Sequence, residues 1–320
     1  MRGELRSVIA MAALLVGSQL IALAVCGPFA TAGFSAFQNP SDVSNTAIYI
    51  IAILAFTGVI LALVKYRRKD IVRYVILGSV FITVAFVLLL PFYYALVGLV
   101  PAMDPNLAAN LATVLGFLAA GLVTWILVKY PEWYVVDTVG LSTAAGVTAI
   151  LGISFSVVPA LLLLIALAFY DAWAVYRTKH MVTLADEVTS QRLPVLLVIP
   201  KHADYKFSEQ KSLKEQVAKG EEREAMFIGL GDLIIPGVLA VSARVFLRDD
   251  IGLSVAGLAP SLLVALITIL GSLVGFAILM RFVLKGNPQA GLPLLNGGAI
   301  AGFFLSLVLV YGTVVPPTVG

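Results

Sequence analysis

Three acidic residues lie within long apolar stretches of this 320-residue sequence: Asp137, Asp171 and Asp232. The other 15 of the 18 Asp and Glu residues fall in polar loops or at the ends of apolar stretches. A carboxylate inside a membrane costs a few kcal/mol or more, so it must face a cavity, find a partner or take up a proton. No Lys or Arg lies well within any apolar stretch. The three acids are therefore the first candidates for a functional site.

Asp171 and Asp232 are expected at one depth in the membrane. Asp171 lies about six residues before Arg177, and Asp232 about seven residues after Ala225, where the next apolar stretch begins. A helical rise of about 1.5 Å per residue would put both acids some 9 to 10 Å below the same surface. Two carboxylates about 4 Å apart repel by roughly 4 kcal/mol at an effective dielectric of about 20, so they hold one proton between them. Such a pair can hydrolyse a peptide, because the ionised acid takes a proton from water while the protonated acid polarises the carbonyl.

The residues around Asp232 favour a water-accessible site. Gly229 and Gly231 are expected to let a neighbouring backbone come close, as small residues do between membrane helices. Pro236 has no N–H, so in a helix the carbonyl of Asp232 loses its partner. The freed carbonyl and the carboxylate favour water at that depth. The alternative interpretation is a kinked helix that serves packing alone. Asp137 follows an interfacial aromatic pair, Trp133 and Tyr134, so it lies either at the membrane surface or in support of the site.

The composition predicts a membrane protein. The sequence is 60% hydrophobic and 12% charged, and that charged share is about half the roughly 25% usual in soluble domains. Too few polar side chains remain to cover a soluble globule, and the net charge of +3 does not suit a nucleic-acid binder. The single cysteine, Cys26, excludes a disulfide framework and a cysteine metal site. His180 and His202 have no metal-ligand spacing, so neither a metal nor another cofactor is expected.

Nine apolar stretches are long enough to cross a hydrocarbon core of about 30 Å. The predicted fold class is therefore all-α, a polytopic membrane protein with nine transmembrane helices. A signal peptide is the alternative for the first stretch, but its apolar run exceeds the roughly 7 to 15 residues of a signal-peptide core, so we expect a retained helix. The stretches lie near Val8–Val25, Ala47–Val64, Ile71–Val97, Leu107–Leu127, Trp133–Leu151, Val157–Val175, Ala225–Val241, Leu253–Met280 and Leu292–Val314.

The basic residues predict the orientation. With the N-terminus inside, 19 of the 21 Lys and Arg fall on the cytoplasmic side, and only Arg244 and Arg248 fall outside. The expected topology is a multi-pass protein of the cell membrane with a cytoplasmic N-terminus and an extracellular C-terminus. Three parts are expected: a six-helix part (residues 1–175) with the first acid, a cytoplasmic loop (176–224), and a three-helix part (225–320) with the second acid. Within the loop, the run Leu193–Pro200 is interpreted as a strand or a membrane-surface segment.

The motifs around the acids resemble those of the presenilin and signal peptide peptidase family of aspartyl intramembrane proteases. Tyr170-Asp171 resembles the family's YD motif, and Gly229-Leu230-Gly231-Asp232 its GxGD motif. The family's third motif, Pro-Ala-Leu-Pro, is approximated by Ala290-Gly291-Leu292-Pro293. The order and spacing of the motifs, the orientation and the nine spans also agree with the family, and the short loops suggest an archaeal homologue close to presenilin.

The resemblance implies a presenilin-like fold and a residue-by-residue site. Asp171 and Asp232 would be the catalytic pair, which cleaves transmembrane segments of membrane proteins within the lipid bilayer. An extended substrate would pair with the backbone edge near Leu292 and Pro293. Ala290 and Gly291 depart from the Pro-Ala of the motif, and the short loop argues against self-cleavage. The residues expected to border the substrate are Tyr170, Gly229, Leu230, Gly231, Ala290, Gly291, Leu292 and Pro293.

Two other functions remain open from the residues alone. A proton-coupled transporter or ion-leak channel would also carry intramembrane acids, with Asp171 and Asp232 as ion sites. A prepilin peptidase shares Gly-x-Gly-Asp but holds its acids close to the cytoplasmic surface, so it fits less well. The sequence indicates no obligatory partner subunit and leaves a homo-oligomer open.

Overall fold

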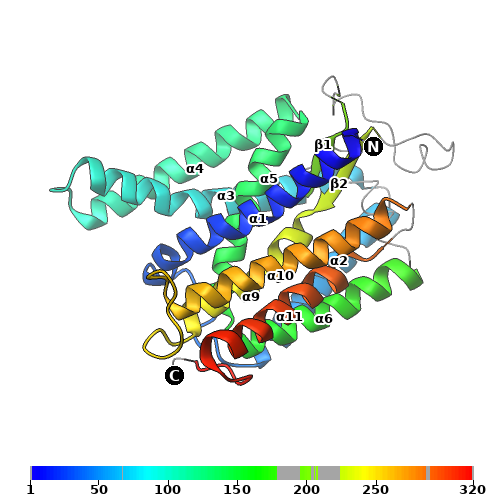
Figure 1. Ribbon diagram of the computed structural model, residues 1–320. Coiled ribbons are helices and arrows are strands. Elements are labelled where there is room, and N and C mark those ends of the chain that lie inside the picture. The colour runs from blue at the N-terminus through cyan, green and yellow to red at the C-terminus, as the bar shows by residue number, and fades with distance from the viewer. Residues whose placement is uncertain are drawn as a thin grey trace. The chain divides into compact units, whose positions relative to one another are not determined.

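The computed structural model describes residues 2–66, 68–178, 195–202, 205, 207, 224–285 and 289–318. Within these ranges the chain forms nine α-helices, eight of them long and apolar enough to cross a membrane, so the predicted helical membrane fold is confirmed. Most of the predicted loop 176–224, including His180, lies outside the described residues. The helices, labelled in Figure 1, are α1 (Arg2–Thr31), α2 (Ser44–Lys65), α3 (Lys69–Leu99), α4 (Pro105–Lys129), α5 (Trp133–Ser154), α6 (Val157–Trp173), α9 (Leu230–Phe246), α10 (Pro260–Val283) and α11 (Gly291–Tyr311).

The chain divides into two compact units. The first unit comprises Met1–Ser7, Gly58–Val147 and Leu184–Leu230, and it holds α3, α4 and the beginning of α5. The second unit comprises Val8–Thr57, Thr148–Thr183 and Gly231–Gly320, and it holds α6, α10, α11 and nearly all of α9. Asp171, Asp232 and the residues from Ala290 to Pro293 all belong to the second unit. Asp137 belongs to the first.

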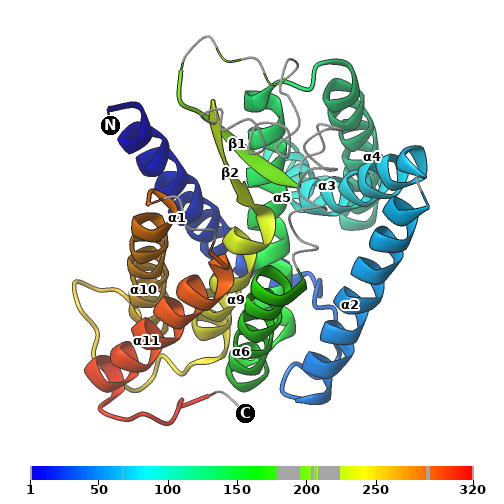
Figure 2. The same ribbon diagram turned by 90° about the vertical axis from the view of Figure 1, so that its right-hand side faces the viewer.

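A two-stranded antiparallel sheet precedes α9. Strand β1 (Leu196–Pro200) pairs with β2 (Ala225–Gly229) from Leu196 opposite Gly229 to Pro200 opposite Ala225. Figure 2 shows the two strands side by side, with β2 leading directly into α9. The strand interpretation of the run around Leu193–Pro200 is confirmed for residues 196–200. The prediction of a helix from Ala225 is wrong, because the first five residues of that stretch are hydrogen-bonded as a strand.

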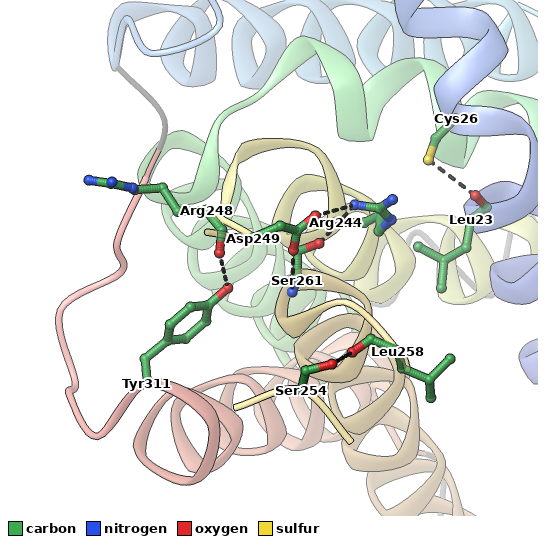
Figure 3. Close-up of polar contacts among 9 residues, drawn as sticks. All are labelled: Leu23, Cys26, Arg244, Arg248, Asp249, Ser254, Leu258, Ser261 and Tyr311. Atoms are coloured by element: carbon green, nitrogen blue, oxygen red, sulfur yellow. Dashed lines mark hydrogen bonds and ion pairs between the residues drawn. The ribbon is translucent and has the colours of Figure 1, made fainter. Parts of the chain in front are cut away.

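The connection between α9 and α10 shows a second boundary that the sequence placed wrongly. The stretch predicted from Leu253 is not helical until Pro260, which takes the first helical position, where its missing N–H leaves no bond unmade. Gly252 and Gly257 have φ of 101° and 77° in this connection, values that interrupt a helix. Arg244, in the last turn of α9, donates to Ser261 at 2.8 Å and pairs with Asp249 at 3.2 Å (Figure 3).

Helices α10 and α11 meet backbone to backbone. Each carries a pair of glycines four residues apart, Gly271 and Gly275 on α10 and Gly298 and Gly302 on α11. A Cβ added at any of the four would lie 2.2 to 2.7 Å from a carbonyl oxygen of the facing helix. Small residues at this spacing let membrane helices approach closely. The contact fixes α11, whose first turn forms part of the site, against α10.

Candidate functional site

Asp171 lies near the end of α6, where its carboxylate faces the start of α11. The side chain is buried, with 7% of its surface exposed. Its Oδ2 accepts a hydrogen bond of 3.0 Å from the backbone N–H of Leu292. This bond caps α11, because the N–H groups of a helix's first turn have no partner within the helix. The positive end of the α11 dipole also favours a carboxylate at this point.

The first turn of α11 has a backbone donor, but no side-chain cap of its own, at the point where the Asp171 carboxylate binds. Ala290, the residue before the helix, is extended, with φ −71° and ψ 126°, and has no side-chain acceptor of its own. Pro293 lacks an N–H, so it adds no unpaired donor to the turn. The N–H of Leu292 bonds to Asp171. This arrangement gives a physical role to the Leu-Pro part of the third motif.

Asp232 approaches the same turn from α9. A Cβ added at Gly291 would lie 2.8 Å from Oδ1 of Asp232 and 3.1 Å from both Cγ and Oδ2. The absence of a side chain at Gly291 thus lets the carboxylate reach the backbone of α11. Since Leu292 holds Asp171 and its neighbour Gly291 adjoins Asp232, the start of α11 brings the two acids together. Asp171 comes from α6 and Asp232 from the first turn of α9.

The prediction that Asp232 lies about seven helical residues from Ala225 is wrong. The first five residues of that stretch form β2, and a strand rises about 3.3 Å per residue, more than a helix does. Pro236 does lie inside α9, as predicted, four residues after Asp232. Its missing N–H leaves the Asp232 carbonyl without the usual helical donor.

The glycines of the GxGD segment differ in their surroundings. No atom lies within 4 Å of a Cβ added at Gly231, so the expected close approach of a neighbouring backbone does not occur there. The space beside Gly231, immediately before Asp232, is open instead. Gly229 ends β2 and Leu230 begins α9, both in the first unit. Tyr170 is half-buried, and its ring centroid lies 6.4 Å from that of Trp173.

Three polar residues that support this region were not identified as site residues from the sequence. Tyr176 donates to Oε1 of Gln289 at 2.6 Å, and its hydroxyl oxygen accepts from the N–H of Ala290 at 3.4 Å, which ties the residues before α11 to the π-helical turn that follows α6. Asn296 donates through Nδ2 to the carbonyl of Leu164 at 2.8 Å, which joins α11 to α6. No sequence signal distinguishes Tyr176 from other interfacial tyrosines, whereas Asn296 is a polar residue in an apolar stretch.

Two carboxylates that meet at one helix end, in a protein of membrane-length helices, are the arrangement of an aspartic hydrolase that works inside a membrane. The sequence matches the family described as signal-peptide peptidase and presenilin aspartyl protease over residues 12–312. The chain belongs to this family. It is therefore an intramembrane aspartic protease, a multi-pass membrane protein that acts on membrane proteins within the lipid bilayer.

Solved structures support the same assignment. Two crystal forms of "a presenilin family intramembrane aspartate protease", in space groups C222 and P2, match with a TM-score of 0.64 each. They are 35% and 36% identical to this chain, the matches cover 94% of it, and they cover 99% and 97% of the solved chains. The comparison with curated proteins found no significant match.

Proposed function

We propose that Asp171 and Asp232 are the catalytic pair of this protease and that the first turn of α11 holds them in working position. The observation that carries the proposal is that neighbouring residues of one helix turn contact both acids. Leu292 donates to Asp171, and Gly291 adjoins Asp232. The two carboxylates share one proton, so one takes a proton from water while the other polarises the scissile carbonyl.

The proposed substrate is a transmembrane segment unwound next to the pair. Peptide bonds inside a helix are hidden from water, so the segment must become extended before attack. The extended backbone of Ala290 and the open space beside Gly231 are proposed to receive it. The remaining residues proposed to border the substrate are Tyr170, Gly229, Leu230, Gly291, Leu292 and Pro293.

Cleavage of a synthetic transmembrane peptide by the purified protein in detergent tests the catalytic pair. Asp171→Asn and Asp232→Asn are each expected to abolish cleavage, because an amide cannot exchange the shared proton. Asp70→Asn, an exposed acid in the first turn of α3, is the matched control and should cleave normally. An aspartic-protease transition-state analogue should inhibit the parent protein. Cleavage that survives either catalytic-site substitution would refute the assignment.

The proposed topology places the N-terminus and the loop 176–224 in the cytoplasm and the C-terminus outside the cell membrane. The proposed division into residues 1–175, 176–224 and 225–320 puts one acid on each side of that loop. Single cysteines introduced at Tyr66 and Thr313 in a Cys26→Ala background test the orientation. A membrane-impermeant thiol reagent added to intact cells should label position 313 and not position 66, and the reverse pattern would refute it. We further propose that the chain needs no partner subunit, which predicts cleavage by the purified chain alone.

A further inference from the structure

Asp137, the third acid in an apolar stretch, contacts the sheet that precedes Asp232. It lies near the start of α5 and is buried, with 9% of its surface exposed. Its Oδ1 accepts a hydrogen bond of 2.7 Å from the backbone N–H of Val198, in the middle of β1. Val198 is fully buried, so without Asp137 this donor would be buried without its observed partner.

The bond closes the outer edge of β1. The carbonyl of Val195 accepts from Leu230, and the N–H of Lys201 donates to Glu224, so alternate residues of β1 face β2. Val198 belongs to the other set, whose backbone groups point away from β2. On that side the carboxylate of Asp137 accepts a hydrogen bond from the N–H of Val198, and Ser7 donates through its hydroxyl to the carbonyl of Pro200 at 3.1 Å.

One turn further along α5, Gly140 lets this helix pack against Leu230, the first residue of α9. A Cβ added at Gly140 would lie 2.5 Å from Cδ2 of Leu197 and 3.3 Å from Cδ2 of Leu230. Both leucine side chains therefore pack directly on the α5 backbone. Leu230 also donates its N–H to Val195 at 3.0 Å, and it stands two residues before Asp232. Asp137 and Gly140 thus hold β1 and Leu230 by a hydrogen bond and by packing.

We propose that Asp137 is a positioning residue for the protease reaction: by anchoring β1 to α5 it fixes Leu230, and through two residues of backbone it fixes Asp232. The inference rests on the proposed catalytic role of Asp232. Asp137 acts as a hydrogen-bond acceptor, not as a third member of the catalytic pair. An amide oxygen at this position should therefore serve as well as a carboxylate.

The test compares Asp137→Asn with Asp137→Leu in the full-length protein in detergent. The asparagine oxygen can still accept from Val198, so kcat should stay within about twofold of the parent. Leucine has the same branching and number of side-chain heavy atoms as aspartate but no acceptor, so kcat should fall about tenfold or more with little change in KM, as expected for the loss of a bond to a buried donor. Thr138→Val is the matched control, because Thr138 is exposed and its hydroxyl bonds only to its own helix at Tyr134.

Hydrogen exchange provides a readout that reports on the anchor directly. In Asp137→Leu the amides of residues 195–199 and 225–230 should exchange faster, while those of α11 keep the parent rate. In Asp137→Asn all of these amides should keep the parent rate. Should the leucine variant fail to fold, Asp137→Ser replaces it, since a serine hydroxyl is too short to reach Val198 and predicts the same losses.

Three results would overturn the proposal. The first is an Asp137→Leu enzyme with faster exchange in the sheet but parental kcat, and the second is parental exchange in that variant. The third is an equal loss of kcat in Asp137→Asn and Asp137→Leu, which would mean that the charge acts. Failure of the catalytic assignment would look different, because Asp232→Asn would then still cleave while the exchange results for Asp137 stayed as expected.

Discussion

One methyl group at Gly291 should displace the carboxylate of Asp232, the proposed catalytic residue. A Cβ at this position would lie 2.8 Å from Oδ1 of Asp232, whereas ordinary contact begins at 3.4 Å, so the carboxylate or α11 must move by about 0.6 Å. A misplacement of 1 Å at a reacting group can cost roughly 100-fold in rate. Scaled to the smaller shift, Gly291→Ala should lower kcat by about tenfold. The substitution also restores the alanine of the family's third motif, so it tests the departure seen in this sequence.

The assay measures kcat and KM on a transmembrane peptide for Gly291→Ala and for Gly297→Ala. Gly297 lies on the same helix, and no atom is within 4 Å of a Cβ added there, so it should lose no activity. Both substitutions favour the helical state by up to about 1 kcal/mol, which means that lower stability would not explain a loss confined to Gly291→Ala. A Gly291→Ala enzyme with parental or higher kcat would refute the reasoning that Asp232 works in close contact with the first turn of α11.

Further substitutions test the supports of the site. Asn296→Leu removes the buried bond to Leu164, so it should lower the melting temperature and should also reduce kcat several-fold or more. Asn110→Leu, on an exposed face of α4, should change neither. Tyr176→Phe removes the hydroxyl that holds the residues before α11, so it should reduce kcat more than it reduces the melting temperature. Gly275→Ala drives a methyl group into a carbonyl of α11 and should destabilise the fold by about 1 to 3 kcal/mol in thermal unfolding, unlike Gly297→Ala. A pair that shares one proton also predicts a bell-shaped dependence of kcat/KM on pH, and a flat profile would contradict it.

The candidate site could be predicted from the sequence because charged residues are scarce in its apolar stretches. Asp171 and Asp232 are conspicuous in apolar stretches, and the three motifs lie in the family's order. The boundary at Ala225 could not be read, because a short apolar run fits a strand as well as a helix and its partner, β1, lies 25 or more residues earlier in the chain. The start of α10 is easier to predict from the sequence, because proline, here Pro260, is a usual first residue of a helix.

The meeting of the acids at α11 depends on tertiary contacts that leave no local pattern. Nothing in the sequence around Leu292 indicates that its N–H bonds to Asp171 rather than to water. Gly291 was predicted as a border of the substrate, and its contact with Asp232 appears only in three dimensions. The role of Asp137 illustrates the same limit: its type indicated importance, while its partner, the Val198 backbone, carries no side-chain signal.

The closed edge of β1 limits how many strands this sheet can accept. Exposed strand edges are places where other chains add, including second copies of the same protein. With Val198 bonded to Asp137 and the Pro200 carbonyl bonded to Ser7, growth past β1 is blocked at two successive outward positions. A strand that joined this sheet could therefore not extend it past β1, so the sheet can grow at most on the side of β2. With growth possible at one edge at most, the sheet offers no template on which strands could polymerise in both directions.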